Sequence, residues 1–134
     1  MGLLLDVDYD HLVEQGVLFD EDEGARVLVF RGLELPHDLY QVETCDVLVL
    51  IPASYNQSGN DMFWTCPRLI RRDGREIPNT SNPGAGENHT RDGLEYCRWS
   101  RHWPEGGHSA WRSGKDDVTS ILRRIDWALR NPDT

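Results

Sequence analysis

The stretch Asp46–Ile51, which reads DVLVLI, decides the fold of this chain because it holds five consecutive apolar residues. A short apolar run rich in β-branched residues is typical of a strand that is buried on both faces of a sheet. Pro52 follows directly and ends the run. A membrane-spanning helix needs about 20 apolar residues, so the run predicts a central strand and not a membrane segment.

Two further segments around this run have strand character. Arg26–Arg31 (RVLVFR) precedes it, and Met62–Thr65 (MFWT) follows it and is stopped by Pro67. Leu39–Val42 is a shorter candidate strand. Consecutive strands with short links favour antiparallel pairing, so the sequence predicts an antiparallel β-meander of about four strands.

Helical patterns lie near both ends of the chain. Asp8–Gln15 predicts a short helix, with Asp8 as its N-cap and Gly16 ending it. Later, apolar residues recur at helical spacing up to Asn131-Pro132: Val118, Ile121, Leu122, Ile125, Ala128 and Leu129. The predicted class is therefore α+β, with a short N-terminal helix and a C-terminal helix covering one face of the meander. A length of 134 residues fits a single domain over 1–134.

Two segments between these elements look irregular. Asp20–Gly24 reads as an acidic turn. Residues 71–93 consist mostly of turn-forming residues, including Asp92-Gly93. A connection of this length without regular structure usually carries function or is disordered.

Composition excludes several functional classes. The net charge is −9, and much of the acidic charge lies near the N-terminus, so nucleic acid is not an expected partner. The three cysteines have irregular spacing and form no CxxC pair, which predicts free thiols. Leu3–Leu5 has no basic residue before it, which argues against a secretory signal peptide. We expect a cytoplasmic protein with no membrane partner.

The densest concentration of reactive side chains is residues 96–103, which read YCRWSRHW. Cys97 is a candidate nucleophile because a thiol has a pKa of about 8.5, which a nearby arginine or histidine can lower. Ser100 is the other candidate, and its hydroxyl needs a base. His102 is two residues away and would share a strand face with Ser100, while His89 or His108 is an alternative base.

The order of these segments resembles the ubiquitin-conjugating fold, and more closely its bacterial branch, prokaryotic family E. Several blocks carry the resemblance: Leu50-Ile51-Pro52-Ala53-Ser54-Tyr55, Asp61-Met62-Phe63-Trp64, Pro67-Arg68-Leu69, Arg98-Trp99-Ser100-Arg101-His102 and Trp111-Arg112-Ser113-Gly114-Lys115-Asp116. The match covers roughly the whole chain. Asn56 stands where the family pattern has proline, and Asn88-His89-Thr90 stands where eukaryotic relatives carry His-Pro-Asn.

The resemblance implies an enzyme that conjugates a ubiquitin-like protein. It would accept that protein from an activating enzyme as an oxyester or thioester and transfer it to an amine of a target protein. The family block favours Ser100 as nucleophile, whereas Cys97 lies where eukaryotic relatives place their cysteine, so both stay open. His102 and Arg101 complete the expected catalytic set, and Arg98, His89 and Asn88 the expected binding set. No cofactor is implied, because the activating enzyme uses the ATP.

Two other classes of function fit the same residues. Members of the superfamily can keep the fold and lose the chemistry, so an inactive module that binds a ubiquitin-like protein or an activating enzyme is the alternative. A metal site would need His89, Cys97, His102 and His108, whose spacing matches no zinc pattern. We therefore expect no metal.

Overall fold

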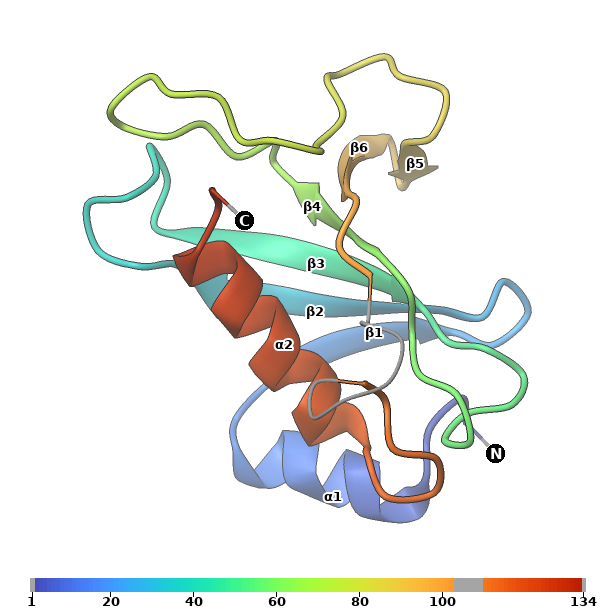
Figure 1. The fold of residues 1–134 in the computed structure, drawn as a ribbon. Coiled ribbons are helices and arrows are strands. Elements are labelled where there is room, and N and C mark those ends of the chain that lie inside the picture. The colour runs from blue at the N-terminus through green and yellow to red at the C-terminus, as the bar shows by residue number, and fades with distance from the viewer. Residues whose placement is uncertain (1, 103–109, 134) are drawn as a thin grey trace.

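Residues 2–102 and 110–133 are described by a computed structural model. Within them, six strands form one antiparallel sheet in the order β1-β2-β3-β4-β6-β5, with two helices packed on it (Figure 1). The elements are α1 (Asp6–Glu14), β1 (Leu18–Asp22), β2 (Val27–Glu34), β3 (Thr44–Leu50), β4 (Phe63–Cys66), β5 (His89–Arg91), β6 (Leu94–Trp99) and α2 (Val118–Arg130). The predicted α+β class and both predicted helices are confirmed, but the sheet has two strands more than expected.

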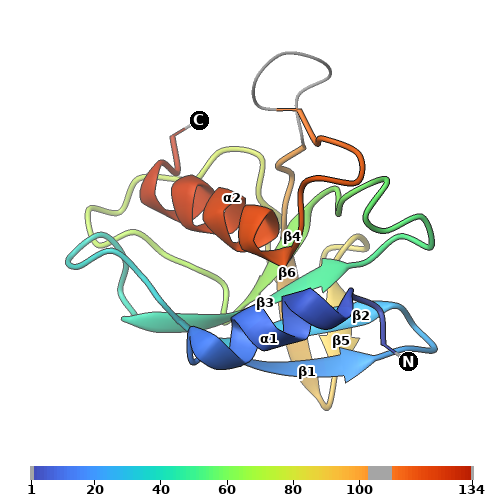
Figure 2. The same ribbon diagram turned by 90° about the horizontal axis from the view of Figure 1, so that it is seen from below.

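Both helices cover the same face of the sheet (Figure 2). Leu12 of α1 and Ile121 and Ile125 of α2 pack there in one apolar core, which the sheet supplies with Leu28, Phe30, Val47, Val49, Phe63 and Trp99. The alternation of side chains along β3 sends Leu48 to the opposite face. The central strand is thus buried on both faces, as its continuous apolar run predicted.

A second, smaller core lies on the other face of the sheet, built from Val27, Val29, Leu48, Trp64 and Tyr96. The indole of Trp64 donates to the Glu87 carbonyl at 2.9 Å and meets the His89 ring edge-on at 4.6 Å. Arg91 of β5 forms an ion pair of 2.6 Å with Asp22 of β1. Since β1 and β5 are the two edges of the sheet, this pair shows that the sheet curls until its edges meet (Figure 2).

The acidic turn predicted for Asp20–Gly24 is only partly confirmed, because residues 18–22 form β1 and the turn spans residues 23–26. One face of this strand packs inward, where Phe19 contacts the Tyr9 ring at 5.9 Å. On β1, Asp20 and Asp22 pair with arginines of β2 and β5. The local run of acidic residues favoured a turn. In the fold, the strand pairs with β2, and the ion pairs compensate the charge of Asp20 and Asp22 in an edge strand.

Two other predicted boundaries change. Leu39–Val42 is not a strand, since Tyr40 makes only an isolated bridge with Arg71. The irregular segment predicted for 71–93 ends at Asn88, where a hairpin begins. Asp92 and Gly93 form its two-residue turn with φ of 52° and 78°. Such a turn needs two residues with positive φ, which aspartate and glycine tolerate.

The N-cap predicted for the first helix is also wrong. Leu5 occupies the N-cap, and Asp8 lies in the first turn, where its Oδ2 accepts the Leu5 N–H at 3.1 Å. At α2 the cap is Asp117, which accepts the N–H groups of Thr119 and Ser120. In the described part of the chain, neither helix has the length and apolar character needed to cross a bilayer.

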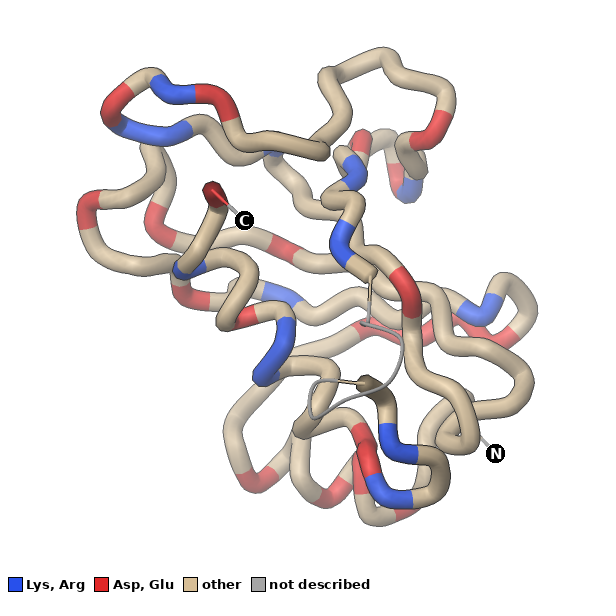
Figure 3. The backbone as a smooth tube through the Cα atoms, viewed as in Figure 1, with Lys and Arg blue, Asp and Glu red and all other residues tan. Residues whose placement is uncertain are grey.

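Charge is distributed unevenly over this fold (Figure 3). Acidic residues follow α1 and β1, while arginines gather in the loop 68–75 and on α2. Acidic and basic residues are therefore concentrated in different parts of the fold.

Candidate active site

Strand pairing places two distant segments at one end of the sheet. Phe63, the first residue of β4, pairs with Trp99, the last residue of β6. Because these strands are antiparallel, the residues just before β4 lie beside the residues just after β6. Asp61 comes from the first group, and Ser100 and His102 come from the second.

These three side chains form a continuous hydrogen-bonded line. The Ser100 Oγ lies 3.2 Å from His102 Nε2, and His102 Nδ1 lies 2.6 Å from Asp61 Oδ1. When Nδ1–H donates to the carboxylate, Nε2 has no proton and accepts the serine hydroxyl. A hydroxyl, an imidazole and a carboxylate in this order are the groups that acyl-transfer enzymes use to activate serine. Asp61 had no role in the sequence prediction.

The relay is open to solvent. The side chain of His102 is 56% exposed, that of Asp61 is 66% exposed, and Ser100 is half-buried. An incoming acyl group and an acceptor can therefore both approach the serine oxygen from outside the molecule.

The backbone around Ser100 is fixed by the segment 79–81. Ser100 donates its N–H to the Asn79 carbonyl at 2.8 Å, and Ser81 donates its N–H to the Arg98 carbonyl at 2.9 Å. Arg124 of α2 donates to the His102 carbonyl. The end of β6 is thus held by the neighbouring segment, and the peptide that follows it is tied to the helix.

The loop that carries Asp61 is held by the segment 111–116. Trp111 Nε1 donates to the Asn56 carbonyl at 2.9 Å, and Asn56 Nδ2 donates to the Asp116 carbonyl at 2.8 Å. A Cβ on Gly59 would lie 2.3 Å from the Trp111 ring, so this close packing requires glycine. Asn56, which replaces the proline of the family pattern, therefore joins the two segments.

Asp116 connects the same segment to α2. Its carboxylate is buried and accepts hydrogen bonds from Arg112, at the backbone N–H and the guanidinium, and from the Ser120 hydroxyl. Burial opposes ionisation, but these hydrogen bonds outweigh it and keep the pKa of Asp116 below its usual value. The block from Trp111 to Asp116 thus has a structural explanation, because it fixes the Asp61 loop to the start of the helix.

Cys97 lies apart from this relay. It is 3% exposed in the interior of β6, where its sulfur is 3.7 Å from the Asn88 amide nitrogen. Burial raises the pKa of the Cys97 thiol, and the Glu95 carboxylate raises it further. Both effects reduce the thiolate that a cysteine nucleophile needs.

Asn88, Arg98 and His89 gather around the base of the β5–β6 hairpin. Asn88 Nδ2 donates to the Asn82 carbonyl at 2.8 Å, while its Oδ1 accepts the Arg98 N–H at 3.1 Å. The Arg98 guanidinium pairs with Glu87 at 3.5 Å. His89 packs on Trp64, and burial lowers the pKa of its imidazole.

The distance from this hairpin group to Ser100 follows from the strand pairing. His89 pairs with Tyr96, which is four residues from Ser100 and therefore about 13 Å away along an extended strand. His89 is accordingly too far from the Ser100 hydroxyl to act as its base.

Arg101 points into the fold. It is 9% exposed, donates to the carbonyls of Pro78 at 3.1 Å and Pro132 at 3.2 Å, and lies 4.9 Å over the Trp99 ring. Burial lowers the pKa of its guanidinium. These contacts make Arg101 a cross-link between the 78–79 segment, β6 and the C-terminal end of the chain.

The metal hypothesis involves three described residues, His89, Cys97 and His102. Within 2–102 and 110–133, no three His, Cys, Asp or Glu side chains converge as metal ligands do. His108 and Trp103 lie outside the described residues.

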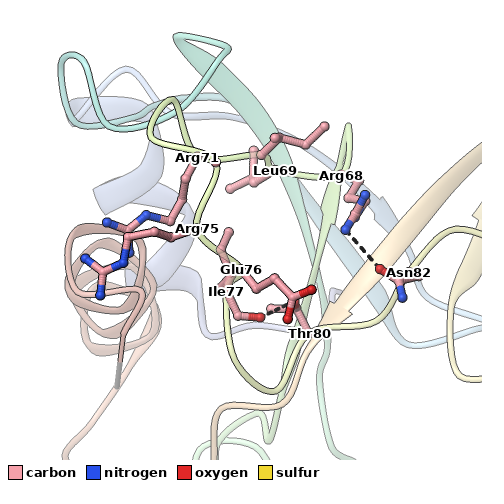
Figure 4. A pocket seen from close by; sticks show the side chains of 10 residues that line it. Arg68, Leu69, Arg71, Arg75, Glu76, Ile77, Thr80 and Asn82 are labelled. Atoms are coloured by element: carbon pink, nitrogen blue, oxygen red, sulfur yellow. Dashed lines mark hydrogen bonds between the residues drawn. The ribbon is translucent and has the colours of Figure 1, made fainter.

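A polar pocket of about 190 Å³ adjoins the segment that holds Ser100 (Figure 4). Its lining comprises Arg68, Leu69, Ile70, Arg71, Gly74, Arg75, Glu76, Ile77, Thr80 and Asn82. Arg71 is engaged by Asp73 and Asp133, and Arg68 donates to Asn82. None of the candidate catalytic or binding residues predicted from the sequence lines this pocket, so pocket and relay are separate features.

The burial of the thiols predicts an order of alkylation. Burial raises the pKa of all three thiols, that of Cys45 to about 12, so accessibility decides the order, and the side chains of Cys45 and Cys97 are buried. Cys66 is half-buried, so iodoacetamide at pH 7.5 should label it first, with Cys97 and Cys45 at least about tenfold slower. Peptide mass spectrometry over time, with a urea-unfolded control that labels all three cysteines, checks this order. Fastest labelling at Cys97 would reverse our assignment of that thiol.

Comparison with known proteins identifies a matching family. The model of the family described as prokaryotic E2 family E matches residues 4–132, nearly the whole chain. No curated protein and no solved structure matched the chain. The match includes the serine–histidine–aspartate line and the segment 111–116 that holds it. The chain therefore belongs to prokaryotic E2 family E.

Proposed function

We propose that this chain is a conjugating enzyme that carries a ubiquitin-like protein on Ser100 as an oxyester and transfers it to a target amine. Family membership supports a role in the conjugation of ubiquitin-like proteins. The observation that supports the finer assignment is the hydrogen-bonded line from Ser100 through His102 to Asp61. We regard residues 1–134 as one domain that carries this role.

The reaction follows from the positions of the three groups. His102 Nε2 removes the Ser100 proton while Oγ attacks the carboxy-terminal thioester of the ubiquitin-like protein on its activating enzyme. The carbon–sulfur bond breaks, and the imidazolium returns the proton to the departing thiolate. A target amine then forms the amide bond, the carbon–Oγ bond breaks, and His102 carries a proton from the amine to Ser100. Asp61 acts as a positioning residue that stabilises the imidazolium.

The tetrahedral intermediates need a hydrogen-bond donor for their oxyanion. The amide of Asn88 is engaged in the hairpin, and Arg101 is engaged inside the fold. Asn79 has an exposed side chain and lies opposite Ser100 in the backbone pairing. We therefore propose the Asn79 amide as the donor.

The choice of Ser100 over Cys97 rests on accessibility and on the base. Ser100 is half-buried and hydrogen-bonded to an imidazole, whereas Cys97 is buried with its pKa raised by burial. An acyl group the size of a protein tail reaches the serine more easily than a thiol inside the strand.

The partners in this proposal are a ubiquitin-like protein, an activating enzyme and a protein target. No cofactor is needed on this chain, because the activating enzyme uses the ATP. A cytoplasmic location agrees with that ATP requirement and with the three free thiols.

Covalent capture tests the proposal. The chain is incubated with an activating enzyme, ATP and a ubiquitin-like protein, and adducts are separated by denaturing electrophoresis. We expect an adduct that resists reducing agent and is cleaved by hydroxylamine. Ser100→Ala should form none, while Cys97→Ala and the matched control Ser58→Ala should form normal amounts.

Two results would contradict this scheme. A reductant-sensitive adduct that Cys97→Ala abolishes would assign the chemistry to the thiol. Binding of the ubiquitin-like protein with no adduct in any variant would indicate the alternative, an inactive binding module.

A further inference from the structure

We infer that the Ser100–His102–Asp61 relay also makes this protein an acyl hydrolase that works alone on activated esters and thioesters of small acyl groups. The inference concerns the same site as the proposed function but differs from it in donor and acceptor. The donor is a small activated ester instead of a protein thioester, and the acceptor is water instead of an amine.

The first reason is that one chain supplies the complete relay. Ser100 Oγ lies 3.2 Å from His102 Nε2, and His102 Nδ1 lies 2.6 Å from Asp61 Oδ1, so the three groups are hydrogen-bonded without any residue from a partner protein. The two nitrogens of His102 have the arrangement that general-base catalysis requires. Nε2 faces the nucleophile, and Nδ1 faces the carboxylate. Serine activation therefore does not depend on an activating enzyme.

The second reason is that the relay is held in place by the fold itself. Asn79 fixes the Ser100 peptide, Arg124 contacts the His102 carbonyl, and Trp111 packs against Gly59 in the loop leading to Asp61. Groups that are positioned before substrate arrives lose little entropy on reaching the transition state.

The third reason is that the exposed site does not exclude water. The side chains of His102 and Asp61 are each more than half exposed, and Ser100 is half-buried. A base that takes a proton from serine can equally take one from water beside an acyl-serine. The same exposure lets small donors reach Oγ without recognition of a protein surface.

The two steps balance without any further reactant. In the first, Oγ bonds to the acyl carbon, the bond to the leaving oxygen or sulfur breaks, and His102 passes the serine proton to the leaving group. In the second, water attacks the acyl-serine while His102 takes its proton. The carbon–Oγ bond then breaks, Ser100 regains a proton, and the carboxylic acid is released.

Two probes test the inference on the full chain in the absence of any activating enzyme. A fluorophosphonate should phosphonylate Ser100 with loss of fluoride, detected by peptide mass spectrometry as one modification per chain. Hydrolysis of p-nitrophenyl acetate should run at least about 10²-fold faster with the wild-type chain than with Ser100→Ala. Ser58→Ala, an exposed serine outside the relay, should match the wild type in both assays.

The outcomes separate this inference from the proposed function. The inference is overturned if the wild type and Ser100→Ala hydrolyse the ester at equal rates, or if the fluorophosphonate labels residues other than Ser100. This holds even when a protein oxyester forms. Labelling and hydrolysis at Ser100 without any protein adduct support the inference and contradict the conjugating function. Loss of hydrolysis in Cys97→Ala alone also overturns the inference. Matching thermal unfolding of the wild type and Ser100→Ala shows that the comparison is between folded proteins.

Discussion

Replacing His102 by glutamine is expected to slow oxyester formation at Ser100 by about 10²–10⁴-fold. The imidazole Nε2 lies 3.2 Å from Oγ and is the group in contact with the serine hydroxyl that can take its proton. Glutamine keeps a polar side chain of similar length but has no basic nitrogen, so the serine stays a neutral hydroxyl. Single-turnover rates of adduct formation measure the change directly.

The neighbouring carboxylate provides a second test of the same relay. Asp61→Asn should lower the rate by about 10²-fold or more, because the amide no longer stabilises the imidazolium or fixes its tautomer. Since Asp61 is a positioning residue, the rate should also be followed against pH, where the variant should show an altered profile. Asp61→Glu, which keeps the charge, should recover part of the rate.

A second histidine–aspartate pair supplies the control for both substitutions. His37 and Asp38 form an exposed pair at 3.1 Å in the loop between β2 and β3, outside the relay. His37→Gln and Asp38→Asn repeat the same chemical changes and should leave the rate unchanged. Equal effects at the two pairs would show that the proposed relay does not act in catalysis.

The parts of the fold that the sequence predicts are those with strong local patterns. The helix ending at Arg130 has a complete apolar face, and Asp46–Ile51 has a continuous apolar run, so both were correctly predicted. β1 was missed because its acidic residues favour a turn locally, whereas in the fold Asp20 and Asp22 pair with arginines from other strands. That compensation depends on strand pairing, which the local sequence does not contain.

The sequence predicted the turn of the β5–β6 hairpin but not its two strands. Asp92-Gly93 was recognised as a turn, and this dipeptide is favoured in two-residue hairpins. β5 was missed because His89–Arg91 has only three residues. Its stability comes from contacts made elsewhere, such as the packing of His89 on Trp64.

The candidate site also contains residues that the local sequence predicts and residues whose positions depend on the fold. Ser100 and His102 were paired on the expectation that residues two apart in a strand share a face. In the structure β6 ends at Trp99, and the two side chains meet in the segment that follows it. Asp61 was visible only as the first residue of Asp61-Met62-Phe63-Trp64, and its approach to His102 depends on the Phe63–Trp99 register. The inward positions of Cys97 and Arg101 likewise depend on which side of the curled sheet each residue faces.

Truncation of Asp8 is expected to destabilise the fold strongly. Its carboxylate is fully buried and accepts three hydrogen bonds: from Leu5 N–H at 3.1 Å, Tyr55 O–H at 2.7 Å and Val118 N–H at 3.2 Å. These donors belong to the start of α1, the turn after β3 and the start of α2. The loss of Asp8 therefore loosens the contact between three parts of the fold at once.

Asp8→Ala should lower the free energy of unfolding by about 3–5 kcal/mol, because each buried donor left without a partner costs about 1–3 kcal/mol. Small domains unfold with about 5–15 kcal/mol, so urea denaturation should show a large shift of the midpoint. Asp10→Ala, an exposed aspartate two residues away on α1, should change stability by less than about 0.5 kcal/mol. Asp8→Asn should fall between them, since one amide oxygen can still accept while the NH₂ group faces donors. A loss below about 1 kcal/mol for Asp8→Ala would mean that water replaces the carboxylate and that the three segments hold together without it.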